Sequence, residues 1–238
     1  MSVYHLHNQL NFPNPAHAGK DGLLAIGGDL SSHRLIEAYR SGVFPWFNPG
    51  DPIMWWSPDP RCVLNTSKVK ISASMRNVMN RQVYEVRMDE QFEMVMRHCM
   101  SVKRKQRGTW IGEEMIRAYV DLHHQGLAHS VEVYCAGELV GGLYGVSLGR
   151  MFFGESMFSH SSNSSKFALI MLCKALETKG VRWIDCQMYT EHLASMGAEL
   201  MSRQSFLELL SDHLSEAGLT GKWGWEREQL TIHSSGHA

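Results

Sequence analysis

Three segments decide the fold of this 238-residue chain: Gly141-Gly-Leu-Tyr-Gly-Val-Ser147, Arg150-Met-Phe-Phe-Gly-Glu-Ser-Met-Phe-Ser159 and Trp183-Ile-Asp-Cys-Gln187. The first two are apolar runs joined by the turn signal Leu148-Gly149, which predicts an antiparallel hairpin. Its strands are expected over 139–147 and 150–153. Upstream, we predict one more strand over 130–134, so this part of the chain should form a sheet.

An apolar helix and a final strand complete this region. The helix is predicted over 165–179, with Asn163 or Ser164 as its cap, and its apolar residues on most sides indicate that it is buried. Gly180 should end it, and a strand should follow over 181–187.

Three polar side chains stand out in this apolar setting: Glu155, Asp185 and Gln187. Side chains alternate along a strand, so Asp185 and Gln187 should share one face while Cys186 takes the other. A carboxylate and an amide placed this way form a small polar site on an apolar floor. The alternative is that Asp185 begins a turn and Gln187 lies on the surface, as these residue types usually do.

The N-terminal part is irregular at its centre. Residues 43–61 contain three tryptophans and five prolines, and proline opposes regular structure, so we predict a rigid loop. Trp55 and Trp56 are expected to pack a core between domains. Trp46 lies between two prolines and is the better candidate for an exposed surface that stacks on a nucleobase.

Periodicity and capping signals predict the other elements. Helices are expected over 32–41 with Ser31 as cap, 72–80, 89–100 with Asp89 as cap, 112–124 and 203–215, and strands over 61–64 and 83–88.

A basic run lies between two predicted helices. It comprises Lys103, Arg104, Lys105 and Arg107, and Trp110 follows shortly after. Such runs are usually solvated loops. Beside an aromatic residue, this one could instead contact a phosphate backbone while Trp110 contacts a base.

Composition limits the class of protein. Apolar residues make up 44% of the chain, charged residues 20%, and the net charge is −1, which allows a core and argues against a non-specific nucleic-acid coat. The five cysteines form no Cys-x-x-Cys pair, and the 13 histidines match no zinc motif, so we expect no metal site. No membrane span or signal peptide is recognisable, which favours a cytoplasmic protein.

The order hairpin, capped helix, strand resembles the acetyltransferase-type (GNAT) fold. This resemblance implies an α/β (α+β) chain with a small N-terminal domain, 1–62, that carries the Trp/Pro-rich loop. A GNAT-like acyltransferase domain with a mixed, mostly antiparallel sheet would occupy 63–238. The fold's usual acetyl-CoA loop is glycine-rich, whereas residues 159–166 contain no glycine, which argues against acetyl-CoA.

Further segments resemble one family, the bacterial leucyl/phenylalanyl-tRNA–protein transferases. The matching stretches lie between about residues 12 and 210, and any one of them alone would be weak. They are Gly22-Leu-Leu-Ala-Ile-Gly-Gly-Asp-Leu30, Gly42-Val-Phe-Pro-Trp-Phe-Asn-Pro-Gly-Asp-Pro-Ile-Met-Trp-Trp-Ser-Pro-Asp-Pro-Arg61, Gly108-Thr-Trp-Ile111, Ala128-His-Ser-Val-Glu132, Glu138-Leu-Val-Gly-Gly-Leu-Tyr-Gly-Val146, Gly154-Glu-Ser-Met-Phe-Ser159 and Ile184-Asp-Cys-Gln187.

This resemblance implies an activity and a site. The family moves Leu, Phe or, less well, Met from aminoacyl-tRNA onto an N-terminal Arg or Lys of a protein, which marks that protein for N-end-rule degradation. It needs no cofactor, and we expect a monomer. By resemblance, Asp185, Gln187 and Glu155 are the catalytic residues. The remaining roles are adenosine binding by Trp46, Trp110, Tyr39 and Tyr119, an aminoacyl side-chain pocket of Leu143, Met157, Leu169, Leu172, Leu176 and Ile184, and contact of the basic run with the tRNA backbone.

The chemistry suits these residue types, because an aminoacyl ester is already activated and needs no enzyme nucleophile. Alternation turns Cys186 away from the polar face. Asp185, bonded to the Gln187 amide, would orient it to accept from the amine. Glu155 would either attract the acceptor's N-terminal cation or form a structural pair with Arg150 or another cation. Two other functions stay open: a GNAT-type N-acetyltransferase and a non-catalytic RNA-binding module.

Overall fold

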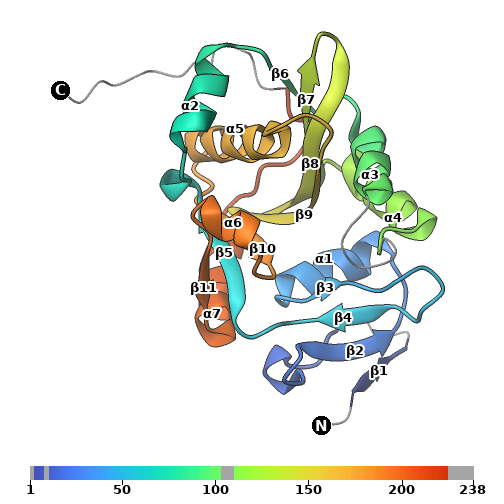
Figure 1. The fold of residues 1–238 in the computed structure, drawn as a ribbon. Helices are drawn as coiled ribbons and strands as arrows, with labels where there is room; N and C mark the ends of the chain where they lie inside the picture. Colours follow the sequence, from blue (N-terminus) through green and yellow to red (C-terminus); the bar gives the residue numbers. More distant parts are fainter. Residues whose placement is uncertain (1–2, 8–10, 103–109, 225–238) are drawn as a thin grey trace.

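The computed structural model describes residues 3–7, 11–102 and 110–224, which form two β-sheets with helices packed around them (Figure 1). The smaller sheet lies at the N-terminal end of the chain and the larger one holds the segments from residue 61 onward. Within these described residues, no helix is both long enough and apolar enough to cross a membrane.

The small sheet has the strand order β1-β2-β4-β3. Its strands are β1 (Tyr4–Leu6), β2 (Leu23–Gly27), β3 (Phe44–Pro45) and β4 (Met54–Trp56). The prediction of a wholly irregular loop over 43–61 is therefore wrong. β3 and β4 pair in antiparallel fashion, with Pro45 opposite Trp55. Pro45 fits because β3 is an edge strand, where a missing N–H costs little.

The large sheet has the order β11-β5-β10-β9-β8-β7-β6. Its strands are β5 (Arg61–Asn65), β6 (Glu85–Met88), β7 (Ala128–Cys135), β8 (Glu138–Leu148), β9 (Met151–Ser159), β10 (Trp183–Gln187) and β11 (Glu199–Met201). Among the described strands of this large sheet, only β9 and β10 pair in parallel, which confirms the predicted α/β class with a mixed, mostly antiparallel sheet. The expected domain boundary at 62 and 63 lies inside β5.

Helices cover both faces of the large sheet (Figure 1). The helix α5 packs on one face, and α1, α3 and α4 pack on the other. The α-helices are α1 (Ser32–Arg40), α2 (Ala73–Asn80), α3 (Phe92–Ser101), α4 (Glu113–His124), α5 (Ser164–Thr178), α6 (Glu191–Ser195) and α7 (Arg203–Leu214), and two 3₁₀ turns cover Pro15–His17 and Thr66–Lys68. Both short elements α6 and β11 were missed by the sequence patterns.

Two predicted caps are wrong. Asp89 does not cap α3; its carboxylate instead accepts from the Trp223 backbone N–H at 2.7 Å and lies 2.8 Å from Nδ1 of His129. Asn163 precedes α5 in a left-handed conformation and gives it no side-chain cap. Ser164 Oγ instead donates to the Val140 carbonyl, which joins the start of α5 to β8. Capping by Ser31 is confirmed.

Glycines in β8 allow elements to approach closely. A Cβ on Gly145 would lie 2.2 Å from the Phe153 carbonyl oxygen, and a Cβ on Gly141 would lie 2.4 Å from Ser164 Oγ. Real Cβ atoms essentially never make such short contacts. Glycine is therefore required at Gly141 and Gly145, where α5 and β9 lie against β8.

A buried ion pair between β5 and β10 lies where the large sheet meets the small one. Arg61, at the start of β5, donates to both carboxylate oxygens of Asp185 at 2.8 and 2.7 Å, and neither side chain is more than 1% exposed. The same guanidinium donates to the Gly42 carbonyl and lies over the rings of Phe44 and Phe206. Arg61 thus connects the large sheet, the small sheet and α7 at one point.

We predict that Gly145→Ala lowers the free energy of unfolding by about 1–3 kcal/mol, because the new methyl group overpacks the β8–β9 contact. Chemical denaturation would measure the loss. Gly224→Ala is the matched control, since nothing lies within 4 Å of its added Cβ, and it should be nearly neutral. Equal stability of the two variants would contradict the steric argument.

We also predict that Arg61→Met costs about 3–5 kcal/mol of unfolding free energy, since it leaves the Asp185 carboxylate buried without its partner. The double variant Arg61→Met/Asp185→Leu should recover much of this loss by removing the stranded charge. Arg97→Met, which breaks exposed pairs, should change stability by less than about 1 kcal/mol. A double variant no more stable than Arg61→Met would refute this account.

Candidate active site

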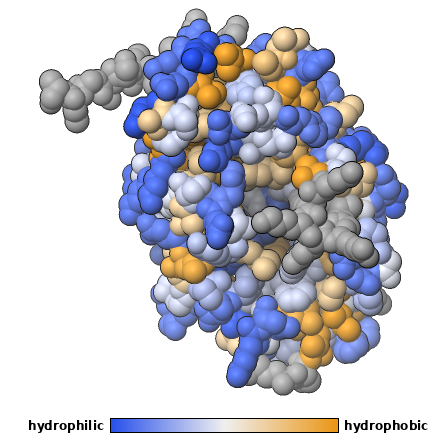
Figure 2. Space-filling view, viewed as in Figure 1, coloured by the Kyte–Doolittle hydropathy of each residue, from blue (hydrophilic) through white to orange (hydrophobic). Residues whose placement is uncertain are grey.

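A cavity of about 390 Å³ opens between the small sheet and the strands β9 and β10. Its volume falls in the range of small-molecule sites, about 300–1,000 Å³. Figure 2 shows the same face as Figure 1, where apolar and weakly polar residues surround a central hollow. Phe44, Pro45 and Trp46 form the small-sheet side, and α5 and α6 contribute to the walls.

Two β-bulges shape this cavity. On β9, Ser156 pairs with Tyr144 and Gly154 pairs with Gly145, so Glu155 is the extra residue. Glu155 therefore lies within β9, although the sequence predicted it just beyond a strand ending at 153. On β10, Asp185 pairs with Val63 and Gln187 with Cys62, so Cys186 is extra. Bulges bend strands and re-aim side chains, often beside active sites.

The second bulge overturns the prediction from alternation. Cys186 lines the cavity together with Gln187, whereas Asp185 does not line it. Gln187 reaches the cavity through a left-handed backbone, with φ of 63°, which is costly for a residue with a side chain. Alternation failed because the extra residue Cys186 breaks the two-residue repeat, so Asp185 and Gln187 do not share one face.

Asp185 acts on the site through the backbone. Its Oδ1 accepts from the Gln187 backbone N–H at 2.9 Å, and both of its oxygens accept from Arg61. The prediction that Asp185 forms a hydrogen bond with the side-chain amide of Gln187 is wrong. Asp185 instead holds the left-handed turn that presents Gln187.

Gln187 is oriented by Glu155. Its Nε2 donates to Glu155 Oε1 at 2.8 Å, which leaves the carboxamide oxygen as the acceptor for a ligand. The alternative that Glu155 pairs with Arg150 is wrong: Arg150 donates to the Lys179 carbonyl and its Nε lies 4.0 Å from Glu216.

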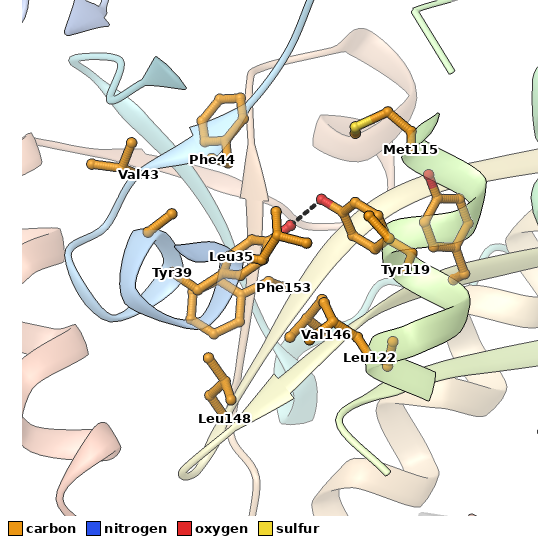
Figure 3. Close-up of a cluster of buried hydrophobic side chains, with 14 of the residues drawn as sticks. Leu35, Tyr39, Val43, Phe44, Met115, Tyr119, Leu122, Val146, Leu148 and Phe153 are labelled. Carbon is orange, nitrogen blue, oxygen red and sulfur yellow. Dashed lines mark hydrogen bonds between the residues drawn. The ribbon is translucent and has the colours of Figure 1, made fainter. Parts of the chain in front are cut away.

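Tyr39 and Tyr119 complete the polar cluster from the helices α1 and α4. Their hydroxyls donate to Glu155 Oε1 at 2.7 Å and Oε2 at 3.1 Å, and they also contact each other (Figure 3). Both side chains are 0% exposed. Their enclosed rings present no face on which a base could stack, so their role in adenosine binding stays a prediction.

Burial shifts the ionisation of this cluster. It raises the pKa of Glu155 to about 7, an effect that the hydrogen bonds from Tyr39, Gln187 and Tyr119 oppose and the charge of Asp185 reinforces. Burial and the nearby Glu155 also raise the pKa of both tyrosines well above that of a free phenol. The tyrosines therefore remain protonated, while Glu155 can gain or lose a proton near neutral pH.

Two tryptophans from distant parts of the chain meet at the cavity. Trp46 and Trp110 both line it and are half-buried. The Trp46 carbonyl accepts from Trp56 Nε1 at 2.6 Å, and the two rings pack edge to face. Trp55 is buried in the core, as predicted, and Trp56 packs against that core.

The apolar floor contains most of the predicted pocket. Leu176 lies in the adjoining core without reaching the cavity. The five residues that do line it are Leu143, Met157, Leu169, Leu172 and Ile184.

Cys186 is a poor nucleophile for a different reason from the one predicted. Contact with the Cys62 thiol, together with burial, raises the pKa of Cys186 well above its ordinary value. It therefore stays a thiol at neutral pH, and only thiolates are strong nucleophiles.

The basic run Lys103, Arg104, Lys105 and Arg107 lies outside the described residues. Within 3–7, 11–102 and 110–224, no group of three or more His, Cys, Asp or Glu side chains could hold a metal ion.

Sequence reasoning missed Arg61 and the small-sheet wall of the cavity. A charged residue opening the apolar run Arg61-Cys-Val-Leu64 was the available signal for a buried ion pair. Phe44, Phe152 and His192 also line the cavity, but apolar and histidine residues at these positions carry no local signal.

Comparisons with known proteins agree on one family. The family model described as leucyl/phenylalanyl-tRNA protein transferase matches residues 63–211, and the model for its N-terminal domain matches residues 28–59. Among curated proteins, the leucyl/phenylalanyl-tRNA–protein transferase of Nitrosospira multiformis is 52% identical and covers 94% of each chain. That of Pseudomonas fluorescens is 51% identical over 88% of this chain and 93% of its own.

Among solved structures, L-PGS from Bacillus licheniformis aligns with a TM-score of 0.36 and 12% identity over 69% of this chain and 58% of its own, a likeness too distant to carry an argument. The two family models match parts of both sheets and include the residues that line the cavity. This chain belongs to the leucyl/phenylalanyl-tRNA protein transferase family.

Proposed function

We propose that this protein transfers Leu, Phe or, less well, Met from aminoacyl-tRNA to the α-amine of an N-terminal Arg or Lys of acceptor proteins, and thereby marks them for N-end-rule degradation. One observation carries the proposal: a single cavity brings together two tryptophans, an apolar floor and the Glu155–Gln187 pair. These are the parts that the ester end of an aminoacyl-tRNA requires. The printed names of the relatives support the same reaction.

The 3′ end of the tRNA would enter beside the tryptophans. Trp46 and Trp110 offer ring surface to the terminal adenosine, and base–aromatic stacking is worth about 1–3 kcal/mol per base. Lys103, Arg104, Lys105 and Arg107 would neutralise phosphates further along the RNA. Tyr39 and Tyr119 would act indirectly, through Glu155.

The aminoacyl side chain would lie on the apolar floor. Leu143, Met157 and Leu172 lie beside Leu169 and Ile184 at this floor. A pocket of such side chains discriminates by only about 1–3 kcal/mol per methylene, which suits a few related residues rather than one.

Gln187 would position the acceptor amine. A free α-amine has a pKa of about 7.7–8.0, so part of it is neutral at pH 7 and no strong base is needed. The carboxamide oxygen of Gln187 can accept from this amine, because its nitrogen is already bonded to Glu155. Asp185 supports the step only by fixing the backbone turn.

The wider setting is part of the same proposal. We infer a monomer that works in the cytoplasm, where its five cysteines, all free among the described residues, would remain reduced.

The test is transfer of labelled Leu from Leu-tRNA to two peptides that differ only in an N-terminal Arg or Ala. We expect transfer to the Arg peptide alone. Gln187→Ala should slow single-turnover transfer about a hundredfold, since a misplaced amine loses its alignment. Gln204→Ala, an exposed glutamine on α7, is the control and should transfer normally.

Two results would contradict the proposal. Bound tRNA with no transfer to either peptide would favour an RNA-binding module, and tight binding of acetyl-CoA would favour an N-acetyltransferase. Asp185→Ala is a poor test of the transfer reaction, because it leaves the buried Arg61 charge without its partner and so lowers the stability of the fold.

The pocket gives a separate prediction. Leu172→Phe should narrow the cavity floor and reduce transfer of Phe relative to Leu by about tenfold, measured as the ratio of kcat/KM for the two aminoacyl-tRNAs. Leu176→Met, in the adjoining core outside the cavity, is the control and should leave the ratio unchanged. An unchanged ratio in Leu172→Phe would place the aminoacyl side chain elsewhere.

A further inference from the structure

Three oxygen-bearing side chains form a closed ring at the cavity wall, with Glu155 lining the cavity and Tyr39 and Tyr119 behind it. Tyr39 and Tyr119 contact each other through their hydroxyls, and Figure 3 shows these groups directed together from α1 and α4. Tyr39 then contacts Glu155 Oε1 at 2.7 Å, and Tyr119 contacts Oε2 at 3.1 Å. Each corner of the ring therefore touches both others.

The number of protons in this ring depends on Glu155. Three oxygen–oxygen contacts need three protons, because each hydrogen bond uses one. The two tyrosines supply two, so with an ionised Glu155 one contact holds no proton. With a neutral Glu155, Oε2–H donates to Tyr119, Tyr119 donates to Tyr39, and Tyr39 donates to Oε1, which also accepts from Gln187 Nε2. Every contact is then satisfied.

We propose that Glu155 holds the third proton of this ring and delivers it to the 3′-oxygen that leaves the tRNA, with Tyr39 and Tyr119 as positioning residues. This inference rests on the proposed transferase function. Glu155 lines the cavity, so its carboxyl group can meet a substrate there, whereas the tyrosines reach the substrate only through it.

The groups around Glu155 favour a neutral carboxyl group. Tyr39 faces it from α1 and Tyr119 from α4; both are uncharged, and although their hydrogen bonds lower the pKa of Glu155, burial outweighs them. The negative charge of Asp185 on β10 also raises the pKa of Glu155, and Asp185 is itself paired with Arg61 on β5. His192 of α6 lines the same cavity, and burial lowers its pKa, so it adds no positive charge at neutral pH. Burial raises the pKa of Glu155 to about 7.

The proton balance of the reaction closes on Glu155. The acceptor nitrogen bonds to the ester carbon, and the bond from that carbon to the 3′-oxygen breaks. The 3′-oxygen takes the carboxyl proton of Glu155 and leaves as a hydroxyl. The carboxylate then takes one proton from the attacking nitrogen. The proton that remains on this nitrogen is the amide N–H. Glu155 ends in its starting state, and the net change is ester plus amine to amide plus alcohol.

The first experiment follows Glu155 without any reaction. Carbon-13 NMR of protein labelled at glutamate carboxyl groups would identify the Glu155 signal by its absence in Glu155→Gln. We expect this signal to titrate at about pH 7. In Tyr39→Phe or Tyr119→Phe the midpoint should rise, since the carboxylate loses a donor. Tyr134→Phe, on β7 beside Arg87, is the control and should leave it unchanged.

The second experiment measures single-turnover transfer of Leu to the Arg peptide from about pH 5.5 to about pH 8.5. The wild-type rate divided by the Glu155→Gln rate cancels the ionisation of the amine and hydrolysis of the ester. We expect this ratio to be about a hundred at low pH, within the range for a general acid, and to fall through the midpoint seen by NMR. Tyr39→Phe should move the fall to higher pH.

The outcomes separate the two proposals. A wild-type protein that transfers no Leu at any pH overturns the transferase function and this inference with it. Normal transfer by the wild type, with Glu155→Gln within about twofold of it or a ratio independent of pH, overturns only this inference. A Glu155 midpoint near its ordinary value, with the carboxyl ionised at neutral pH, also overturns it.

Discussion

The buried pair of Arg61 and Asp185 is the interaction on which the rest of the structure depends. It places a positive and a negative charge where water is excluded, and such a pair persists only when further contacts satisfy it. Here those contacts come from the Gly42 carbonyl, two aromatic rings and the Gln187 backbone N–H. One guanidinium thus fixes the small sheet, the large sheet and α7 relative to the side-chain amide of Gln187.

This arrangement separates structural from chemical roles among neighbouring polar residues. Asp185 is enclosed and neutralised, so it supports the backbone, while Gln187 two positions later faces the cavity. Glu155 joins the two roles, because protein atoms surround it on most sides and a substrate can reach it on one. The environment of each group, rather than its residue type, decides which part it plays.

Much of the fold follows from sequence pattern, because helix periodicity and turn residues act locally. The helix containing Leu172 and the strand β10 were predicted close to their observed bounds, and the hairpin with its Gly149 turn was predicted too, although its second strand runs to Ser159 instead of ending at 153. Most of the apolar floor could also be predicted, by resemblance. Cys186 shows what could not: its direction depends on a bulge, which arises from pairing with β5 and leaves no mark in the strand itself. Arg61 and Asp185 are 124 residues apart, so no local sequence pattern predicts their contact.

Because Glu155 lies in a bulge, the pairing of β8 with β9 does not depend on this residue. β8 and β9 pair on both sides of it, so the hydrogen-bond ladder between these strands does not use this residue. Glu155 alone occupies the extra position of the bulge. Removing one residue here would restore an ordinary hairpin and leave its neighbours facing as before. In a sheet of this kind, a functional group is gained or lost most simply through a change in strand length, and alignment gaps inside strands become as informative about activity as substitutions.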